Sequence, residues 1–243
     1  MPKLTLTYFD FDGGRGEAAR LAMHLGGIAF EDRRIPGKDW PALRDTMPFR
    51  ALPVLEVDGV SISQSNTINR YLGKLTGLYP RDDWQASLVD EIMDAVEDIS
   101  TSIGNTMALE GAAKQKAREA LAAGSIPRYL QQLEARLSAG GGEWFVENRL
   151  TVADLKCFLW VRWLKSGALD HVPADIVEKN APLLAAHFER VMRRSWRNTL
   201  IGSGASRESR RTTPPAGSND ADSGCPPIRH LWCPRHRAPT HRG

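Results

Sequence analysis

The most constraining feature of this chain is the run Leu52-Pro53-Val54-Leu55-Glu56-Val57-Asp58-Gly59. Pro53 has no N–H to donate, so it can only begin or edge a strand, and an X-Pro bond is the one place where a cis peptide is cheap. Asp58-Gly59 is the dipeptide that a two-residue hairpin turn prefers, because its central residues need positive φ. The run therefore predicts two antiparallel strands, the first starting at Pro53. A cis bond would turn the Leu52 backbone outward, where it can pair with an extended ligand.

A helix is predicted directly after this hairpin. Gln64-Ser65 precedes an apolar pattern with helical spacing, made by Ile68, Tyr71, Leu72 and Leu75. A serine at this point can cap the free N–H groups of the helix, and the same groups and the helix dipole attract a carboxylate. From position alone, an ordinary cap that serves only stability is the more common role of such a serine.

The N-terminal segment predicts one βαβ unit. Leu4, Leu6 and Tyr8 alternate with threonines, and a glycine-rich loop leads to a helix and then to a strand over 30–35. Tyr8 then stands at the carboxyl end of the first strand, where open α/β sheets place their ligands. A packed aromatic with a wet hydroxyl is the alternative interpretation of a tyrosine in this position.

Long helical patterns replace strand signals from Trp84 onward. The expected helices cover residues 85–108, 112–137, 152–165 and 181–194. Thr151-Val152-Ala153-Asp154 is a capping box, with a hydroxyl three positions before an acidic residue, and it is given a structural role only. The predicted organisation is an α/β domain over 1–80, a linker over 78–83, an all-α domain over 84–203 and a tail over 204–243.

Several motifs occur in the order and spacing of a known family. They are Tyr8-Phe9, Gly14-Arg15-Gly16-Glu17, Glu31-Asp32, Asp39-Trp40-Pro41, Met47-Pro48-Phe49, the run 52–59, Gln64-Ser65 and Arg70-Tyr71-Leu72. The chain thereby resembles the cytosolic glutathione S-transferases, and the sigma class above all, from Leu4 to about Asp98 and more weakly to about Val191. The resemblance implies a thioredoxin-like α/β domain followed by the all-α domain. No Cys-x-x-Cys follows the first strand, which excludes thioredoxin-type disulfide chemistry.

The resemblance implies a catalytic role for Tyr8 and Arg15. In the family, the matching tyrosine donates a hydrogen bond to the glutathione sulfur, and the matching arginine adds positive charge. Both favour the thiolate, which is the nucleophile, because a free thiol with a pKa of about 8.5 is mostly protonated at neutral pH. Lowering the thiol pKa by about two units corresponds to roughly 2.7 kcal/mol, which a strong hydrogen bond and a nearby charge can supply.

The resemblance also implies which residues bind glutathione. These are the backbone of Leu52, before Pro53, for the cysteinyl part; Gln64 and Ser65 for the γ-glutamyl part; and Trp40 and Arg44 for the glycyl end. Asp98 matches an acidic residue that reaches the glutamyl amine of the partner's glutathione in sigma-class dimers, so a homodimer is expected. The acidic run around Asp98 is equally consistent with a solvated helix face.

The implied reaction is the conjugation of glutathione, as co-substrate, to small hydrophobic electrophiles. We expect the acceptor pocket near residues 9–12, residues 101–107 and the C-terminal helices. Asn105 stands where vertebrate sigma-class prostaglandin D synthases have a tryptophan, which argues against that isomerase activity. The alternatives are a glutathione-dependent peroxidase or another isomerase, and a non-catalytic binding or structural relative.

The C-terminus departs from the family pattern after about Met192. Residues 204–243 contain seven basic and three acidic residues, a net charge of +4. The rest of the chain contains 25 basic and 26 acidic residues, a net charge of −1. Such a composition does not fold by itself, and a basic tail can bind nucleic acid or acidic membranes. It is also typical of a shifted reading frame, so we hypothesise a frame change near residues 192–196 and expect neither nucleic acid nor membrane as a partner.

Cysteine usage predicts no metal site and a reducing compartment. Cys225 and Cys233 lie in the tail near histidines at a spacing that is poor for zinc, and Cys157 lies in an apolar helix as a small buried hydrophobe. There is no signal peptide and no apolar run long enough to span a bilayer. A soluble cytoplasmic protein is therefore expected.

Overall fold

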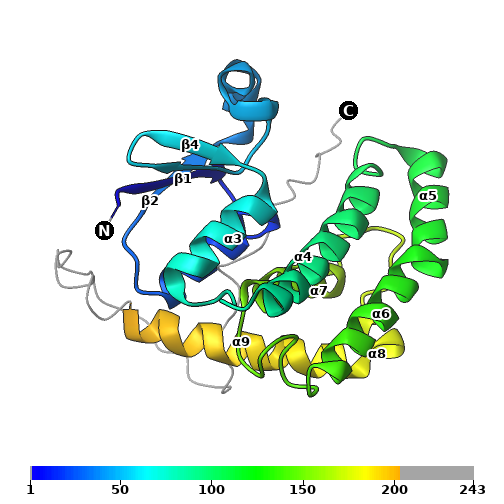
Figure 1. Ribbon diagram of the computed structural model, residues 1–243. Helices are drawn as coiled ribbons and strands as arrows, with labels where there is room; N and C mark the ends of the chain where they lie inside the picture. Colours follow the sequence, from blue (N-terminus) through cyan, green and yellow to red (C-terminus); the bar gives the residue numbers. More distant parts are fainter. Residues whose placement is uncertain (1, 203–243) are drawn as a thin grey trace, which may run out of the picture.

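The first domain is built on a four-stranded mixed sheet (Figure 1). The structure is a computed structural model that describes the backbone of residues 2–202 and the side chains of residues 2–194. The strand order is β2-β1-β3-β4, with β1 parallel to β2 and antiparallel to β3. The strands are β1 (Leu4–Phe9), β2 (Glu31–Ile35), β3 (Val54–Val57) and β4 (Val60–Ser63), and the main helices of this domain are α1 (Glu17–Leu25) and α3 (Ser65–Thr76). The predicted βαβ unit is thus confirmed as β1-α1-β2.

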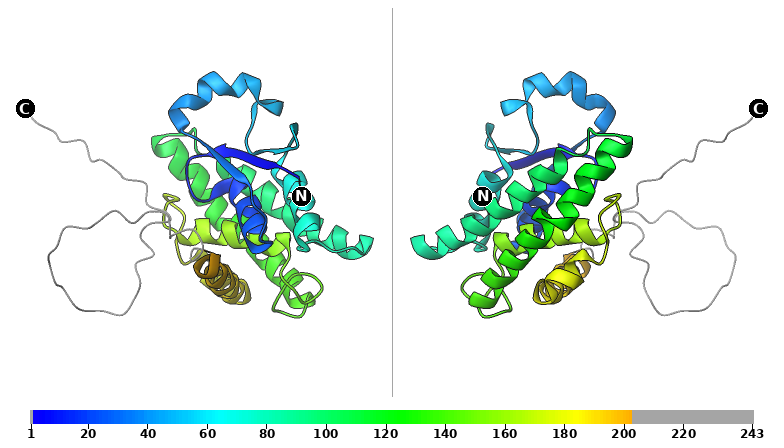
Figure 2. Two further views of the ribbon diagram at one scale, coloured as in Figure 1. Left: turned by 90° about the vertical axis from the view of Figure 1, so that its left-hand side faces the viewer. Right: turned by 90° about the vertical axis from the view of Figure 1, so that its right-hand side faces the viewer.

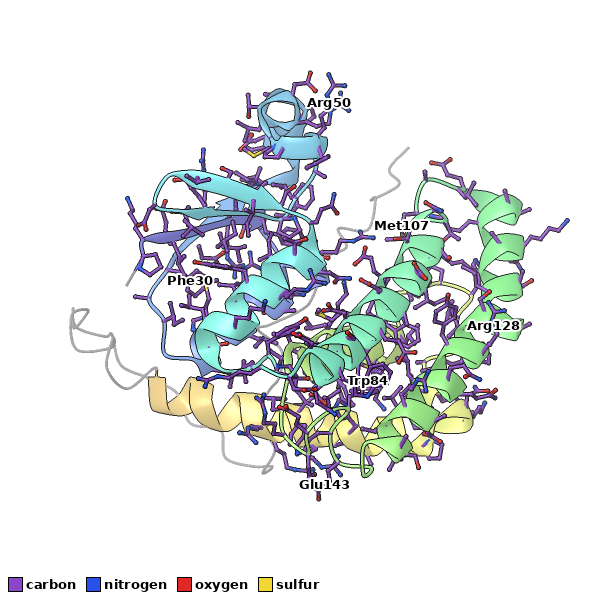
Figure 3. The ribbon with its side chains drawn as sticks, viewed as in Figure 1. Phe30, Arg50, Trp84, Met107, Arg128 and Glu143 are labelled. Atoms are coloured by element: carbon purple, nitrogen blue, oxygen red, sulfur yellow. The ribbon has the colours of Figure 1, made fainter. Side chains whose placement is uncertain are left out.

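Short helical turns precede α1 and fill the segment between β2 and β3. They are η1 (Gly14–Gly16), which precedes α1, and then η2 (Gly37–Asp39), α2 (Trp40–Leu43), η3 (Arg44–Thr46) and η4 (Pro48–Arg50). Figure 3 labels Arg50 at the tip of this segment, which projects from one end of the sheet.

The hairpin adopts the predicted geometry. The Leu52–Pro53 bond is cis, and Asp58 and Gly59 both have positive φ, 49° and 86°. β3 and β4 pair antiparallel directly around this turn, with Val57 opposite Val60.

The second domain is entirely helical over the part of the chain that the structure describes. Its helices are α4 (Asp83–Gly104), α5 (Gly111–Ala123), α6 (Ser125–Ala139), α7 (Val152–Lys165), α8 (Ile176–Asn180) and α9 (Pro182–Gly202). Figure 1 shows α9 running along the bottom of the molecule beneath both domains, and the views of Figure 2 show the same helix nearly end-on. None of the helices within residues 2–202 is both long and apolar enough to cross a membrane.

Helix α7 joins the two domains. It packs against α4 and α9 of its own domain and against α1 and α3 of the first domain. The contact with α3 is close: a Cβ added to Gly73 would lie 2.9 Å from Cγ1 of Val152. One continuous apolar core therefore extends through both domains.

Three predicted helix boundaries are wrong. The helix expected over 112–137 is two helices, α5 and α6, because the backbone leaves the helical region at Gly124, whose φ and ψ are −129° and −85°. Glycine is a poor helix former, and the apolar periodicity on both sides concealed the break. The helix expected over 85–108 ends at Gly104, and the backbone of the last helix continues past residue 194 to Gly202. The prediction for the tail over 204–243 lies outside the described residues.

The capping box is confirmed, and its acidic residue, Asp154, also bonds to other parts of the helical domain. The Asp154 carboxylate is fully buried and accepts hydrogen bonds from Thr151 N and Oγ1, both at 2.7 Å, and from Phe145 N at 3.2 Å. His187 Nε2 of α9 lies 2.9 Å from the same carboxylate. Asp154 thus joins the start of α7 to the preceding loop and to the last helix.

We expect Asp154→Ala to be strongly destabilising. The substitution leaves two backbone N–H groups and a histidine ring nitrogen buried without an acceptor, so the free energy of unfolding should fall by about 3 kcal/mol or more. Urea unfolding followed by circular dichroism measures this change. Asp39→Ala, at an exposed position, is the matched control and should change the free energy of unfolding by less than about 0.5 kcal/mol. A loss below about 1 kcal/mol for Asp154→Ala would contradict this account.

Candidate functional site

Tyr8 lies at the end of β1 and faces the loop that leads to α1. Its side chain is nearly buried, and its hydroxyl oxygen accepts a hydrogen bond from Arg15 N at 3.0 Å. Within the described residues the hydroxyl proton has no acceptor. Tyr8 is therefore positioned by the backbone of the loop and keeps its own proton free to donate to a ligand.

Two glycines of this loop pack directly on the tyrosine. A Cβ added to Gly16 would lie 2.5 Å from Cγ of Tyr8, and one added to Gly14 would lie 2.5 Å from the hydroxyl oxygen. Gly14 also has a φ of 65°, which favours glycine. The loop can close over Tyr8 only because these positions carry no side chain.

Burial sets the protonation of Tyr8. Loss of hydration raises the pKa of Tyr8 above its usual value of 10.0, and this outweighs the opposing effects of the Arg15 N–H and of the Arg15 and Arg20 charges. The hydroxyl therefore stays protonated at neutral pH, as a hydrogen-bond donor requires.

Glu97 of α4 joins Arg15 to the rest of the site. Its Oε1 accepts from Arg15 Nε at 2.6 Å, and its Oε2 accepts from Lys156 Nζ at 2.6 Å and from Ser65 Oγ at 3.2 Å. Arg15 also donates to Thr101 Oγ1 at 3.2 Å. One carboxylate thus connects the loop after β1, the start of α3 and helix α7.

The charges around Glu97 shift two pKa values. Burial opposes ionisation of Glu97, but attraction by Lys156 and hydrogen bonds from Lys156 and Arg15 outweigh it and lower the Glu97 pKa to about 2. Burial lowers the Lys156 pKa below its ordinary value of 10.5, and Glu97 opposes that shift. Glu97 is therefore a stable anion at neutral pH.

Ser65 does not cap α3, which corrects the expectation. It is the first residue of the helix, and its hydroxyl faces Glu97 and Lys156, the latter at 3.3 Å, instead of the helix N–H groups. Gln64 occupies the cap position with a φ of 72°, and its side chain makes no capping bond. A positive φ at a non-glycine residue is costly and is often retained at ligand sites.

The other predicted ligand residues are placed around this centre. The Leu52 backbone makes no hydrogen bond with another described residue, and Trp40 packs edge-on against Phe9, with ring centroids 5.4 Å apart. Arg44 is exposed and pairs with Asp45 at 3.4 Å, away from the Tyr8 cluster. Asp98 is exposed on α4 and its side chain makes no ion pair among residues 2–194. The structure thus brings together Tyr8, Arg15 and Ser65 but not Arg44 and Asp98.

A cavity of about 360 Å³ opens beside Tyr8, Arg15, Glu97 and Lys156. Its remaining wall is mainly apolar and comes from the loop after β1, from the end of α4 and from α7: Phe11, Val96, Met107, Leu159, Trp160 and Trp163. Figure 3 labels Met107 just beyond the end of α4. The cavity therefore places the Tyr8 hydroxyl next to space suited to an apolar molecule.

Sequence reasoning missed Glu97, Lys156 and the two tryptophans of α7. Glu97 was hidden within an acidic run, and Trp160 and Trp163 lie in a helix for which only a structural role was predicted. Lys156 left a usable signal, because it is a charged residue between Leu155 and Cys157 in an otherwise apolar stretch. Cys157 is fully buried, as predicted, and burial raises the pKa of its thiol. Among the described residues there is no cluster of three or more acidic, histidine or cysteine side chains suited to a metal ion.

The fold and site together define a class of protein. A thioredoxin-like sheet with a cis-proline before its third strand is joined to a helical domain, and the ligand cavity lies where the two domains meet. The cavity is lined by a tyrosine hydroxyl with a free proton and by an arginine.

Comparison with known proteins agrees with this class. The family model for the glutathione S-transferase N-terminal domain matches residues 4–74, and that for the C-terminal domain matches residues 97–196. Glutathione S-transferase 1 of Ascaris suum is 39% identical over 159 residues, which cover 64% of this chain and 77% of the relative. Hematopoietic prostaglandin D synthase of Gallus gallus is 36% identical over 185 residues, covering 76% and 88%.

A solved structure extends the likeness to the whole fold. Prostaglandin synthase D of Nilaparvata lugens superposes with a TM-score of 0.72 at 29% sequence identity, covering 87% of this chain and all of the other. The chain belongs to the glutathione S-transferase family, which confirms the resemblance seen in its motifs.

We expect Glu97 to make stability depend on pH in the acidic range. Its folded pKa of about 2 lies below its ordinary value of 4.5, so its contribution is complete above pH 4.5 and is lost as the pH falls toward 2. The drop in the free energy of unfolding from pH 6 to pH 3 should be smaller in Glu97→Gln by about 1–2 kcal/mol, allowing for solvent screening. Denaturant unfolding at both pH values measures this. Glu119→Gln, at an exposed position of α5, should keep the wild-type drop. Equal drops in wild type and Glu97→Gln would contradict the assignment.

Proposed function

We propose that this protein is a glutathione transferase that activates the thiol with the Tyr8 hydroxyl and conjugates it to small hydrophobic electrophiles. The observation that supports this best is the Tyr8 hydroxyl itself. Its oxygen is held by Arg15 N, its proton is free, and it lines an apolar cavity. Membership of the family supplies glutathione as the co-substrate.

In the proposed reaction, Tyr8 donates a hydrogen bond to the glutathione sulfur as the thiol loses its proton to solvent. The sulfur then attacks the electrophilic carbon, forming a C–S bond as the leaving group departs with its electron pair. Arg15 adds positive charge near the sulfur. Because burial raises the Tyr8 pKa, Tyr8 acts as a donor and not as a tyrosinate base at neutral pH.

The predicted peptide contacts fit an extended glutathione. The Leu52 backbone pairs with the cysteinyl amide, as a β-bridge would. Gln64 and Ser65 hold the γ-glutamyl group at the start of α3, where the helix dipole favours an anion. Trp40 and Arg44 bind the glycyl end, which requires Arg44 to turn from Asp45 to the ligand carboxylate.

The electrophile occupies the cavity beside Tyr8. The expected segments around residues 9–12 and 101–107 contribute Phe11, Asp12, Gly104 and Met107, and α7 contributes its tryptophans. Asn105 is exposed and does not line this cavity. Conjugation is therefore preferred to the prostaglandin isomerisation that the names of some relatives indicate for those proteins.

We expect Tyr8→Phe to impair catalysis with little effect on binding. Loss of a hydrogen bond to a charged sulfur should lower kcat/KM for glutathione and a generic aryl halide by about 10- to 100-fold. The Kd for glutathione should change by less than about threefold, because the bond strengthens only with the thiolate. Conjugation assays and calorimetry measure the two quantities.

Tyr129→Phe on α6 is the matched control, because Tyr129 lies outside the cavity. Its kcat/KM should equal that of wild type. Undiminished conjugation by Tyr8→Phe would rule out the proposed role of Tyr8. If wild type binds glutathione but turns over no aryl halide, hydroperoxide or isothiocyanate, the alternative of a non-catalytic binding protein replaces the transferase. Turnover of hydroperoxides alone would select the peroxidase alternative.

We propose further that the protein is a homodimer in which Asp98 of the partner subunit binds the glutamyl ammonium. Asp98 is exposed and free to serve a neighbouring subunit. Sedimentation should give about twice the chain mass of 26.9 kDa. Asp98→Asn should weaken glutathione binding roughly tenfold, whereas Asp83→Asn on the same helix should not. A monomer, or unchanged binding by Asp98→Asn, would remove this role.

A further inference from the structure

Lys156 is a buried cation whose position is not explained by packing. It lies on α7 with 7% of its surface exposed, between apolar neighbours. Its ammonium donates to Glu97 Oε2 at 2.6 Å, to Ser65 Oγ at 3.3 Å and to Asn66 Oδ1. A lysine is rarely buried unless its charge is used. Three donors are thereby directed at the first turn of α3 and at the acid beside it.

The charges around Lys156 leave a surplus of positive charge. Arg15 and Lys156 share the single carboxylate of Glu97, so these three groups carry a net charge of +1. Asp94 is the other acid that acts on Lys156, but it is exposed on α4 and accepts from Asn66 Nδ2 at 2.6 Å. Its effect is reduced by solvent screening. The cluster can therefore accept one more anion without becoming negative.

The hydrogen bonds of Lys156 also leave room for an anion. Two of its three donors go to neutral acceptors, the hydroxyl of Ser65 and the amide oxygen of Asn66. A carboxylate is a stronger acceptor than either. If the Ser65 hydroxyl turns from Glu97 Oε2 to donate to a ligand oxygen at about 2.7 Å, that oxygen can also lie within reach of Lys156 Nζ, because Oγ and Nζ are only 3.3 Å apart.

We infer that Lys156 is a glutathione-binding residue that pairs with the α-carboxylate of the γ-glutamyl group at Ser65. The inference rests on the proposed function, which places that group at the start of α3. Lys156 would thus bring the helical domain into direct contact with the peptide, beside the contacts from the first domain. Lys156 is expected to determine affinity for the glutamyl end and not the chemistry at sulfur.

A purely structural role makes a different prediction. As a link between α3, α4 and α7, Lys156 would support the shape of the whole site, and its loss would weaken every ligand to a similar extent. A direct contact with the α-carboxylate affects only ligands that carry this group. The two roles are separated by 4-aminobutyryl-cysteinylglycine, which is glutathione without its α-carboxylate.

The experiment measures the Kd of glutathione and of this analogue by calorimetry, for wild type, Lys156→Met and Lys156→Arg. We expect Lys156→Met to weaken glutathione about tenfold or more and to change the Kd of the analogue by less than twofold. Lys156→Arg keeps the charge and should recover most of the affinity. kcat at saturating glutathione should fall less than threefold in both variants.

Lys165→Met, at the end of the same helix and paired with Glu178 outside the cavity, is the matched control and should bind both ligands as wild type does. Thermal unfolding monitors the fold of each variant. If Lys156→Met weakens both ligands equally, or neither, the inference is overturned while the transferase remains. If Lys156→Met does not fold, the test rests on Lys156→Arg. The inference is then overturned if Lys156→Arg binds glutathione no more tightly than wild type binds the analogue. If wild type binds no glutathione at millimolar concentration, the proposed function fails first and the inference falls with it.

Discussion

The carboxylate of Glu97 is the contact on which the site depends. It is held between a guanidinium from the first domain and an ammonium from the second, both at 2.6 Å. Arg15 extends from the loop after β1 and Lys156 from α7, and Glu97 is the group that both cations contact. A half-buried carboxylate shared by two cations is costly to lose, since the buried Lys156 would be left without its anionic partner. The same group therefore links the two domains by ion pairs, in addition to their shared apolar core, and contributes to the charge beside Tyr8.

The local elements of the fold were predictable from the sequence. The cis-proline, the Asp58-Gly59 turn, the βαβ unit and the Thr151-Asp154 cap each depend on neighbouring residues, and the structure contains all four. The break at Gly124 was not predicted, because periodicity continues on both sides of it and a glycine within a helix is tolerated at a modest cost. Local sequence patterns thus predicted the presence of a helix or strand more reliably than the residue at which it ends.

The position of a site residue was predictable only where it depends on a single strand, loop or helix. Tyr8 was placed at the end of its strand by local alternation, whereas the catalytic roles of Tyr8 and Arg15 were expected only from the resemblance to the family. Glu97 and Lys156 are 59 positions apart in the sequence, and nothing in either neighbourhood indicates that they meet. Ser65 shows the same limit, because its hydroxyl was expected to serve its own helix and instead serves two side chains from other helices. Contacts of this kind arise from the packing of α3, α4 and α7, which periodicity does not describe.

The packing of Gly14 and Gly16 on Tyr8 has a consequence for how this protein can be altered. Because the loop touches the tyrosine at two points, the position of the Tyr8 hydroxyl depends on the absence of side chains at Gly14 and Gly16, and these two positions tolerate almost no variation. The opposite wall has no such restriction, since Met107, Leu159 and Trp163 line the cavity without holding Tyr8. Substitutions that change which molecules the cavity accepts, in nature or in a directed library, would accordingly occur mainly in the helical domain. The loop after β1 would remain as it is.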